Sequence, residues 1–416
     1  MNREILKEII LDQNRDHTEP DLIARDNEGV LGEYIKNKFV IIISGIRRCG
    51  KSTLLKKIKS LYTGYYLNFD DERLINFKVE DFQLLYETFI ELYGERNIFY
   101  FDEIQNIVGW ERFVRRLNDD GKKVLVTGSN ATMLSRELRT HLTGRYLEIK
   151  MYPFSFNEFL KFKKFKLDHN SFYGASSKAS LKTYFDEYLL EGGFPEYIKD
   201  KNKDYLKLLY ENILYRDILV RYKLSNERNL KDLVHLAVTN LSNKISFNSL
   251  TKLLNISSPT TIKEYFDYLE NSYLSFLVSS FDYSLKRQIR SAKKVYIIDN
   301  ALASYLGFRF SKDHGKLLEN LVFLELKRRG KEIYYFSEEQ ECDFVLKEGI
   351  NATESIQVCY DFNKENQERE ISGLLGVMAK LKLKKGLVLT MEREEELKVG
   401  GKKIIVKPIW KWLLEK

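Results

Sequence analysis

In the first third of the chain, short runs of apolar residues alternate with segments whose apolar residues recur at helical spacing. Such runs are typical of strands buried on both faces, and their alternation with helices predicts a parallel α/β sheet. A short amphipathic helix over 2–12, with Ile5, Ile9 and Ile10 on one face, is predicted to pack against this core. We expect strands at 39–43, 65–69, 98–101, 124–127 and 146–149.

The middle of the chain is dominated by helical patterns. Residues 160–235 carry Leu, Tyr and Lys at helical spacing. Two short amphipathic helices follow, at 245–254 and from Pro259 onward, and they are joined by a polar turn. Proline is favoured in the first turn of a helix, so this pattern is typical of a helix-turn-helix. With strands at 275–280 and 295–298, the module would resemble a winged helix.

After Gly315 the pattern predicts another α/β region, which begins with a helix over 317–326 and ends with further strands. Together these patterns indicate an α/β protein with domains at 1–155, 156–235, 236–310 and 311–416. The expected strands of the last region are 333–336, 344–346, 355–360, 386–390 and 403–406.

Composition places the chain among globular proteins and excludes disordered and disulfide-rich classes. Hydrophobic residues make up 44% and charged residues 31% of the 416 positions. The three cysteines are widely separated, so we expect no disulfide framework, no zinc site and a cytoplasmic protein. No apolar segment approaches the length of a membrane span, and membrane insertion is not expected. The net charge of +8 permits nucleic-acid contact without requiring it.

Residues 44–53 read Ser-Gly-Ile-Arg-Arg-Cys-Gly-Lys-Ser-Thr, between an apolar run and a helical pattern. The residues fit the phosphate-binding pattern G-x-x-x-x-G-K-[ST], in which backbone N–H groups surround phosphate oxygens. Gly45 and Gly50 would permit close backbone approach, Lys51 would reach the β- and γ-phosphates of ATP, and Ser52 would hold Mg²⁺. The alternative is a chance match in a glycine turn. The predicted nucleotide-binding residues are Gly45, Arg48, Cys49, Gly50, Lys51, Ser52 and Thr53.

Two carboxylates, Asp102 and Glu103, end the third apolar run. Ligands of open α/β sheets bind at this edge. Asp102 would share Mg²⁺ with Ser52, mostly through water, and Glu103 would orient or deprotonate the water that attacks the γ-phosphate. Solvated acids at a strand end are the alternative.

Polar residues after the fourth and before the fifth predicted strand complete the candidate catalytic set. Ser129 or Asn130 would sense the γ-phosphate or position the water, and either could instead cap the helix predicted from about 131. Arg145 could stabilise transition-state charge as an arginine finger, often in a neighbouring subunit, which would require a homo-oligomer. It could equally be a surface arginine at a helix end.

The chain resembles the AAA+ superfamily, and within it bacterial and archaeal ATPases that join an AAA-type core to a C-terminal restriction-endonuclease-like domain. The resemblance implies Mg²⁺-dependent ATP hydrolysis, a helical lid over 156–235, and nucleotide-driven movement of the winged-helix and C-terminal domains. It also implies that the turn at 191–195 places Pro195 near the adenine. The residues that carry it are those of the P-loop, 102–105 with Trp110, 127–129, 144–145, 153–159 and 191–195.

Two alternatives to a nucleotide-driven motor stay open from the sequence. The first is a nucleotide-switched module that binds protein or nucleic acid. The helix that would enter a DNA groove carries Lys263 but also Glu264, Asp267 and Glu270, so base reading there is not favoured. Packing or protein contact is an equal alternative for this module. The candidate phosphate-contacting residues of the wing are Lys286, Arg287, Arg290, Lys293 and Lys294.

The second alternative is a nuclease. Glu319 and Asp343 match the first two acids of a restriction-endonuclease-like metal site, whereas Gln357 and Cys359 replace the expected acid and lysine. Loss of that acid weakens metal binding, and loss of the lysine removes a cation that would support a nucleophile. We therefore expect a nuclease fold without efficient nuclease chemistry, although Glu354 lies nearby. Arg47 and Arg48 either mark a family signature or pair with the acids after Phe69.

Overall fold

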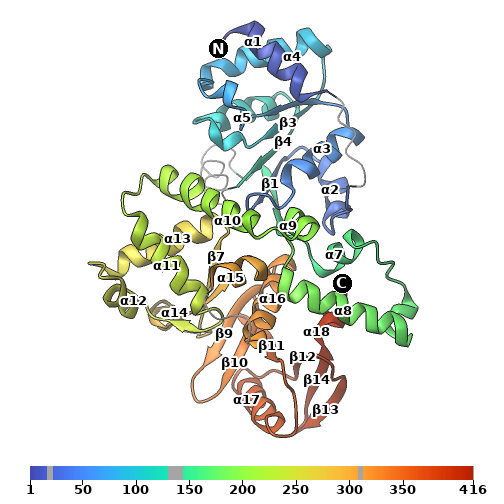
Figure 1. Cartoon of the computed structure of the whole chain (residues 1–416), viewed down its shortest axis with the longest axis vertical. Coiled ribbons are helices and arrows are strands. Elements are labelled where there is room, and N and C mark those ends of the chain that lie inside the picture. Colours follow the sequence, from blue (N-terminus) through green and yellow to red (C-terminus); the bar gives the residue numbers. More distant parts are fainter. Residues whose placement is uncertain (16–21, 130–143, 308–312, 416) are drawn as a thin grey trace. The chain divides into compact units, whose positions relative to one another are not determined.

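The computed structural model describes residues 1–15, 22–129, 144–307 and 313–415, which fall into two compact units. The first unit comprises 1–152 together with the short segment 271–273, and the second comprises 153–270 and 274–416. The three boundaries expected between the four predicted domains stay predictions, and each compact unit is described below by itself (Figure 1).

The first unit is built around a five-stranded parallel sheet with the order β2-β3-β4-β1-β5, which confirms the predicted α/β core. The expected strand positions are correct to within two residues at each end. The strands are β1 (Val40–Gly45), β2 (Tyr65–Asn68), β3 (Ile98–Asp102), β4 (Lys123–Gly128) and β5 (Tyr146–Met151).

Helices cover both faces of this sheet because successive side chains of a strand point to opposite faces. One face packs against α1 (Arg3–Gln13), α4 (Phe82–Tyr93) and α5 (Trp110–Asp119) around a core of Phe, Leu, Ile and Val. The other carries α3 (Lys51–Leu61), which contacts β1, β3 and β4. Helix α2 (Glu28–Ile35), which the sequence analysis did not predict, lies between α1 and β1 in the chain.

The buried face of α1 differs in one residue from the predicted face. Leu6, Ile9 and Ile10 are fully buried, whereas Ile5 is 46% exposed. Residues at i, i+3 and i+4 share a face, so the stripe that begins at Leu6 is the consistent one.

The second unit begins with a succession of helices, as the helical spacing predicts. The helices are α7 (Phe156–Phe162), α8 (Ala175–Glu191), α9 (Pro195–Asp200), α10 (Lys203–Asn212), a π-helical segment (Ile213–Val220) and α11 (Glu227–Thr239).

A small three-stranded sheet with the order β6-β8-β7 follows, together with the predicted helix pair α12 (Phe247–Leu254) and α13 (Pro259–Asn271). Helix α11 packs against α12 and β8. The other elements of this region are β6 (Lys244–Ile245), β7 (Ser275–Ser279), α14 (Leu285–Arg290), β8 (Lys293–Ile297) and α15 (Asn300–Leu306).

The C-terminal part forms a mixed six-stranded sheet with the order β13-β14-β12-β11-β10-β9. Strand β13 was not predicted, although the pair Gly400-Gly401 between β13 and β14 is a recognisable hairpin turn. The elements are α16 (His314–Arg328), β9 (Glu332–Ser337), β10 (Glu341–Glu348), β11 (Asn351–Cys359), α17 (Gln367–Lys380), β12 (Lys385–Thr390), β13 (Glu395–Val399), β14 (Lys402–Pro408) and α18 (Ile409–Trp412).

Candidate functional site

The glycine loop connects the end of β1 to the start of α3, which is the strand–loop–helix context that the motif requires. A Cβ atom on Gly45 would lie 2.1 Å from the carbonyl oxygen of Met151, so only glycine fits beside β5. Gly50 has φ +97 and Arg48 has φ +62, and both therefore adopt the left-handed conformation. The loop is thus held in a tight curve before the N-terminus of α3.

Arg25, which the sequence analysis did not single out, fastens this loop from the side. Its guanidinium donates to the backbone oxygen of Cys49 at 2.8 Å and to that of Tyr152 at 2.7 Å. These two carbonyls belong to the loop and to the end of β5, so one planar fork joins the two segments.

The predicted carboxylates lie at the same edge of the sheet as the glycine loop, because all five strands are parallel. Asp102 is the last residue of β3 and is fully buried, and Glu103 follows with 9% exposure. Glu103 has φ +51, an unfavourable conformation for a residue with a side chain. Such strain persists where the surroundings hold a residue in place, and it is common at functional sites.

Thr127 on β4 organises these acids, because β4 lies between β3 and β1. The hydroxyl of Thr127 donates to Asp102 Oδ1 and accepts from the backbone N–H of Glu103 at 2.9 Å. Tyr66 donates to Asp102 Oδ2 at 3.1 Å, and Ser52 also hydrogen-bonds to Asp102. The structure thereby brings together Ser52 and Asp102, the two predicted Mg²⁺ ligands.

Lys51 is buried in this cluster and faces Glu103. Its Nζ lies 3.5 Å from Glu103 Oε1 and donates to the backbone oxygen of Ile46 at 3.1 Å. Burial lowers the pKa of Lys51, but the charges of Glu103, Cys49 and Asp102 together outweigh burial and raise that pKa above its usual value. Burial acts to raise the pKa of Glu103. The charges of Lys51 and then Arg47 nevertheless hold this pKa below its usual value.

Asp102 has the opposite shift. Burial, followed by the neighbouring charge of Glu103, raises the pKa of Asp102 despite its hydrogen bonds from Thr127 and Ser52. A divalent cation at Asp102 would favour the ionised form, since an opposite charge nearby lowers a carboxyl pKa. The oxygen donors of Asp102 and Ser52 suit Mg²⁺, so the residues fit this cation.

A second hydrogen-bonded chain supports the base of the loop. Tyr273 donates to Ser44 Oγ at 2.8 Å, and Ser44 donates to Glu148 Oε1 at 2.7 Å. Ser44 directly precedes Gly45, so a residue far along the sequence contacts the strand that carries the glycine loop.

The remaining loop residues differ in how they can contribute. Arg47 lies 3.9 Å from Asp70, which confirms one predicted partner among the acids after Phe69. Arg48 and Thr53 are exposed, and Cys49 is buried with its thiol toward the Met151 carbonyl at 3.6 Å. Burial raises the pKa of Cys49.

Of the two candidate residues that follow β4, Ser129 and Asn130, only Ser129 lies within the described residues. Ser129 directly follows β4 and is buried at the same edge as Asp102. Asn130 and the helix predicted from 131 lie outside the described residues.

Arg145 immediately precedes β5, at the opposite edge of the sheet, where its backbone oxygen accepts from Val40. Five residue steps separate the β1–β5 pairs at the two edges, which corresponds to roughly 17 Å. The guanidinium of Arg145 is half-exposed and is bonded to Asp119 at 2.7 Å. Arg145 is therefore not part of the cluster in its own chain.

The glycine–proline turn at 191–195 belongs to the second unit and has a packing role there. The N–H of Gly193 donates to Asp299 Oδ2 at 2.7 Å, and its carbonyl accepts from Phe154 at 2.7 Å. A Cβ atom on Gly192 would lie 2.2 Å from Asp299 Oδ1. Pro195 begins α9, as is common for proline.

The predicted basic patch of the wing is only partly present. Lys294 is 8% exposed and ion-paired with Glu319 and Asp343, so its prediction as a phosphate contact is wrong. Lys293 is half-buried and donates to the Gln288 carbonyl.

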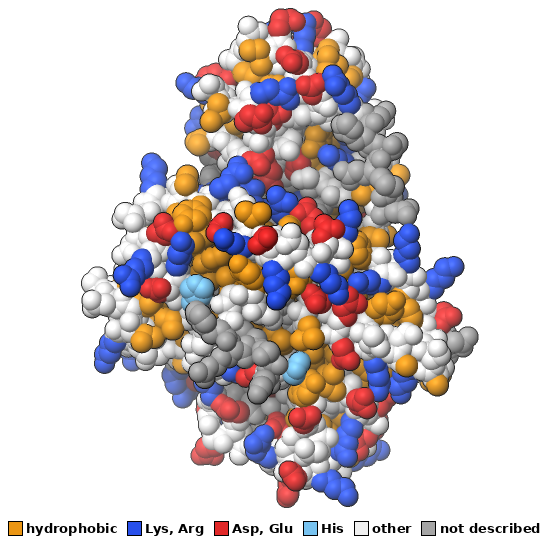
Figure 2. Space-filling model, in the orientation of Figure 1, with side chains coloured by type: hydrophobic (Ala, Val, Ile, Leu, Met, Phe, Trp, Pro, Cys, Tyr) orange, Lys and Arg blue, Asp and Glu red, His pale blue; other side chains and the backbone are white. Residues whose placement is uncertain are grey.

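The other three basic residues of the patch are exposed on α14. Arg287 is bonded to Asp282 at 2.9 Å, whereas no ion pair is recorded for Lys286 or Arg290 within the described residues. Figure 2 shows basic and acidic side chains interspersed over the visible face.

The two nuclease-like acids do come together in the second unit. Glu319 and Asp343 both contact Lys294, and burial followed by the charge of Asp343 raises the pKa of Glu319 to about 7. Within the described residues, no group of three His, Cys, Asp or Glu could hold a metal ion. Glu354 is partly buried, and burial raises its pKa.

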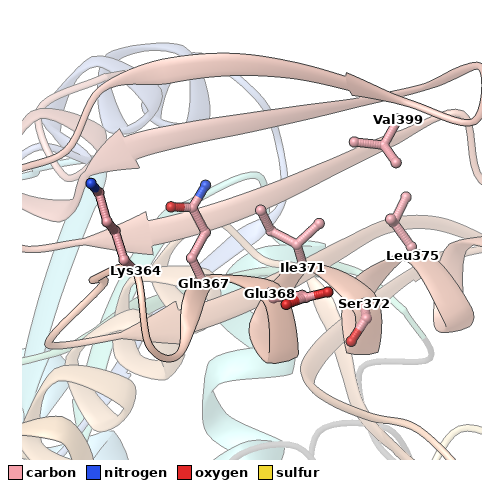
Figure 3. Close-up of a pocket in the computed structure, with 7 residues that line it drawn as sticks. All are labelled: Lys364, Gln367, Glu368, Ile371, Ser372, Leu375 and Val399. Carbon is pink, nitrogen blue, oxygen red and sulfur yellow. The ribbon is translucent and has the colours of Figure 1, made fainter.

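A surface groove of about 370 Å³ lies elsewhere, between α17 and β13. Ile371, Leu375 and Val399 line it with polar neighbours (Figure 3). None of the predicted site residues borders it, so it does not enlarge the candidate site.

Sequence comparison agrees with this geometry. Residues 37–160 match the model of an AAA domain, and residues 182–313 match a domain of unknown function. The Uncharacterized protein MJ1544 of Methanocaldococcus jannaschii is 37% identical over 99% of this chain and 95% of its own length. The chain belongs to the family of this archaeal protein.

An uncharacterized protein of Haemophilus influenzae is also similar to this chain, with 31% identity over 95% of this chain and 99% of its own length. The crystal structure of Cdc6p from Pyrobaculum aerophilum covers 74% of this chain and 98% of its own at 12% identity, with a TM-score of only 0.26. The matched AAA domain contains the P-loop, and it supports an ATP-binding protein of the AAA+ type. None of its described helices is long and apolar enough to cross a membrane.

Proposed function

We propose that this chain is a Mg²⁺-dependent ATPase. The observation that carries the proposal is the cluster of Lys51, Ser52, Asp102 and Glu103 at the carboxyl edge of the parallel sheet, in which all members but Ser52 are buried. Such a cluster combines a phosphate-binding cation, oxygen ligands for Mg²⁺ and a carboxylate able to orient water. Bound Mg²⁺ would neutralise charge on the β- and γ-phosphates.

The pairing between Lys51 and Glu103 suggests how nucleotide prepares the site. A phosphate at the N-terminus of α3 attracts the Lys51 ammonium, for which Glu103 competes at 3.5 Å. When the Lys51 side chain pairs with the phosphate in place of Glu103, the Glu103 carboxylate becomes free to accept a proton from water. Gln105 holds the second oxygen of Glu103 at 2.5 Å and so restricts its orientation.

The test compares single substitutions in the full chain. Lys51→Ala is expected to abolish ATP binding, because it removes the phosphate-binding cation. Glu103→Gln is expected to retain or tighten binding and to lose turnover by at least about 10²-fold, the scale of general-base catalysis. Nucleotide binding is measured by calorimetry, and turnover by phosphate release. Full turnover in Glu103→Gln would remove the assignment of Glu103.

The roles of the remaining candidates are proposed with this function. Ser129 would contact the γ-phosphate from the end of β4, and Pro195 would lie near the adenine. Arg145 would act only on the nucleotide of a neighbouring subunit, because it lies at the opposite edge of its own sheet. Turnover per chain that stays constant on dilution to monomers would contradict this role. The lid over 156–235, the winged helix and the restriction-endonuclease-like domain are proposed from the same resemblance.

A second candidate function is nucleic-acid binding controlled by nucleotide. Tyr283 is 72% exposed next to α14, where Lys286 and Arg290 are also exposed, and an aromatic ring with flanking cations suits single-stranded nucleic acid. Neutralising both cations should reduce the slope of log K against log salt concentration by about 1.4 for single strands and about 1.8 for duplex DNA. Absence of DNA or RNA affinity at low salt would leave a protein partner for this surface.

A further inference from the structure

A buried cation lies between two carboxylates in the second unit. Lys294 on β8 places its Nζ 2.9 Å from Glu319 Oε1 and 2.9 Å from Asp343 Oδ1. The three side chains come from three elements, β8, α16 and β10, and each is at most 16% exposed. One ammonium group therefore forms ion pairs with both carboxylates.

Each of the two carboxylates also accepts a hydrogen bond from a group other than Lys294. Tyr296 donates to Glu319 Oε1 at 2.7 Å, and the backbone N–H of Val358 donates to Asp343 Oδ2 at 3.0 Å. These donors satisfy buried acceptors without a metal and fix the direction of both carboxylates. Protein groups alone therefore hold both carboxylates.

The same cluster does not fit a divalent cation. Mg²⁺ requires several oxygen ligands around it, whereas the centre of this cluster is a lysine nitrogen. Gln357, at the place expected for a third acid, donates to Glu370 at 2.9 Å and accepts from the N–H of Asp343 at 3.3 Å. Cys359, at the place expected for a lysine, has its thiol toward the Asp361 carbonyl.

We propose that Lys294 is the resident cation of this carboxylate pair, so that the pair fastens β8 to α16 and β10 and takes no divalent metal. The second unit then has a structural joint where a nuclease would have its metal.

The packing around the cluster supports a joint. The ring of Tyr296 stacks on Phe323 with centroids 4.2 Å apart, and Asn320 exchanges hydrogen bonds with the backbone of Ile297. Three residues of β8, Lys294, Tyr296 and Ile297, thus form hydrogen bonds with α16 inside one compact unit.

The first experiment counts Mn²⁺ sites in the full chain by electron paramagnetic resonance without nucleotide. Wild type and Glu319→Gln are expected to bind the same number of Mn²⁺ ions. Any ion bound at Asp102 is counted in both proteins and does not affect the comparison. Lys294→Met removes the ammonium with little change in length but leaves two carboxylates without a third acid, so it is expected to bind no additional Mn²⁺. Loss of one equivalent in Glu319→Gln alone would overturn the proposal, because it would place a metal at the pair in the wild type.

The second experiment measures the joint by thermal unfolding. Removing one member of a buried charge cluster leaves the other charges unpaired, so Lys294→Met should lower the Tm clearly. Lys244→Met is the matched control, because Lys244 pairs with Glu341 on the same body but at the surface. An equal Tm for the two variants would overturn the fastening role. If Lys294→Met does not fold, the comparison of wild type with Glu319→Gln still decides whether a metal resides there.

Discussion

At the residue scale, Thr127 decides whether two acids in adjacent positions become a site. Asp102 and Glu103 follow each other in sequence, but their useful orientations differ, and the Thr127 hydroxyl bonds to both. In the sequence, the only sign of this role is that Thr127 is a polar residue near the end of an apolar run. Its importance follows from β4 lying between β3 and the strand that carries the glycine loop.

Thr127→Val should lower turnover about 10-fold to 10²-fold, because it leaves the Glu103 N–H and one Asp102 oxygen unsatisfied in a buried site. Thr127→Ser keeps the hydroxyl and should stay within a few-fold of wild type. Turnover and ATP affinity are measured separately. Equal turnover in the valine and serine variants would show that the hydroxyl does not organise the acids.

Asp299 should make stability depend on pH. Burial raises the pKa of Asp299 to about 6, whereas an unfolded aspartate titrates near 3.9. The folded state therefore binds the proton more tightly between these values, and the free energy of unfolding falls as pH rises from about 4 to about 6, by up to about 3 kcal/mol.

Asp299→Asn cannot ionise, so it should lose this pH dependence while keeping the amide oxygen as a helix cap. Chemical unfolding of both proteins from pH 4 to pH 7 measures the difference. A constant gap between the two curves would contradict the raised pKa.

At the element scale, the turn between α8 and α9 shows how a motif can have a packing explanation. Gly192 has φ +64 and lies against Asp299, while Gly193 lies against Phe154. These contacts account for both glycines within the second unit. The resemblance alone suggested a role at the adenine.

Gly192→Ala should cost more stability than its backbone conformation explains. Gly330 offers a matched control in the same unit, because it has φ +66 and a Cβ atom added there would meet no heavy atom within 4 Å. Each alanine is strained by the positive φ, by about 1–3 kcal/mol, and only Gly192→Ala adds a clash with Asp299. Thermal unfolding of both variants tests this, and equal losses would contradict the contact.

At the scale of the whole molecule, nucleotide should stabilise the first unit in preference to the second. ATP at 100 times its Kd stabilises the state that binds it by about 2.7 kcal/mol. Calorimetry should show the shift in the transition of residues 1–152, and Lys51→Ala should remove it. A uniform shift of all transitions would mean that the two units unfold as one cooperative body.

The sequence by itself determined the local features of this protein: the five buried strands, the glycine loop before α3, the acids at the end of β3 and the helix pair whose second helix starts at Pro259. These follow from side-chain periodicity and backbone conformation, which act within a few residues. Strand order and long-range contacts do not, because a strand's neighbours depend on the whole core. Only the tertiary structure therefore decided that Thr127 and Arg25 support the site, that Arg145 lies at the opposite edge, and that Lys294 is buried between Glu319 and Asp343.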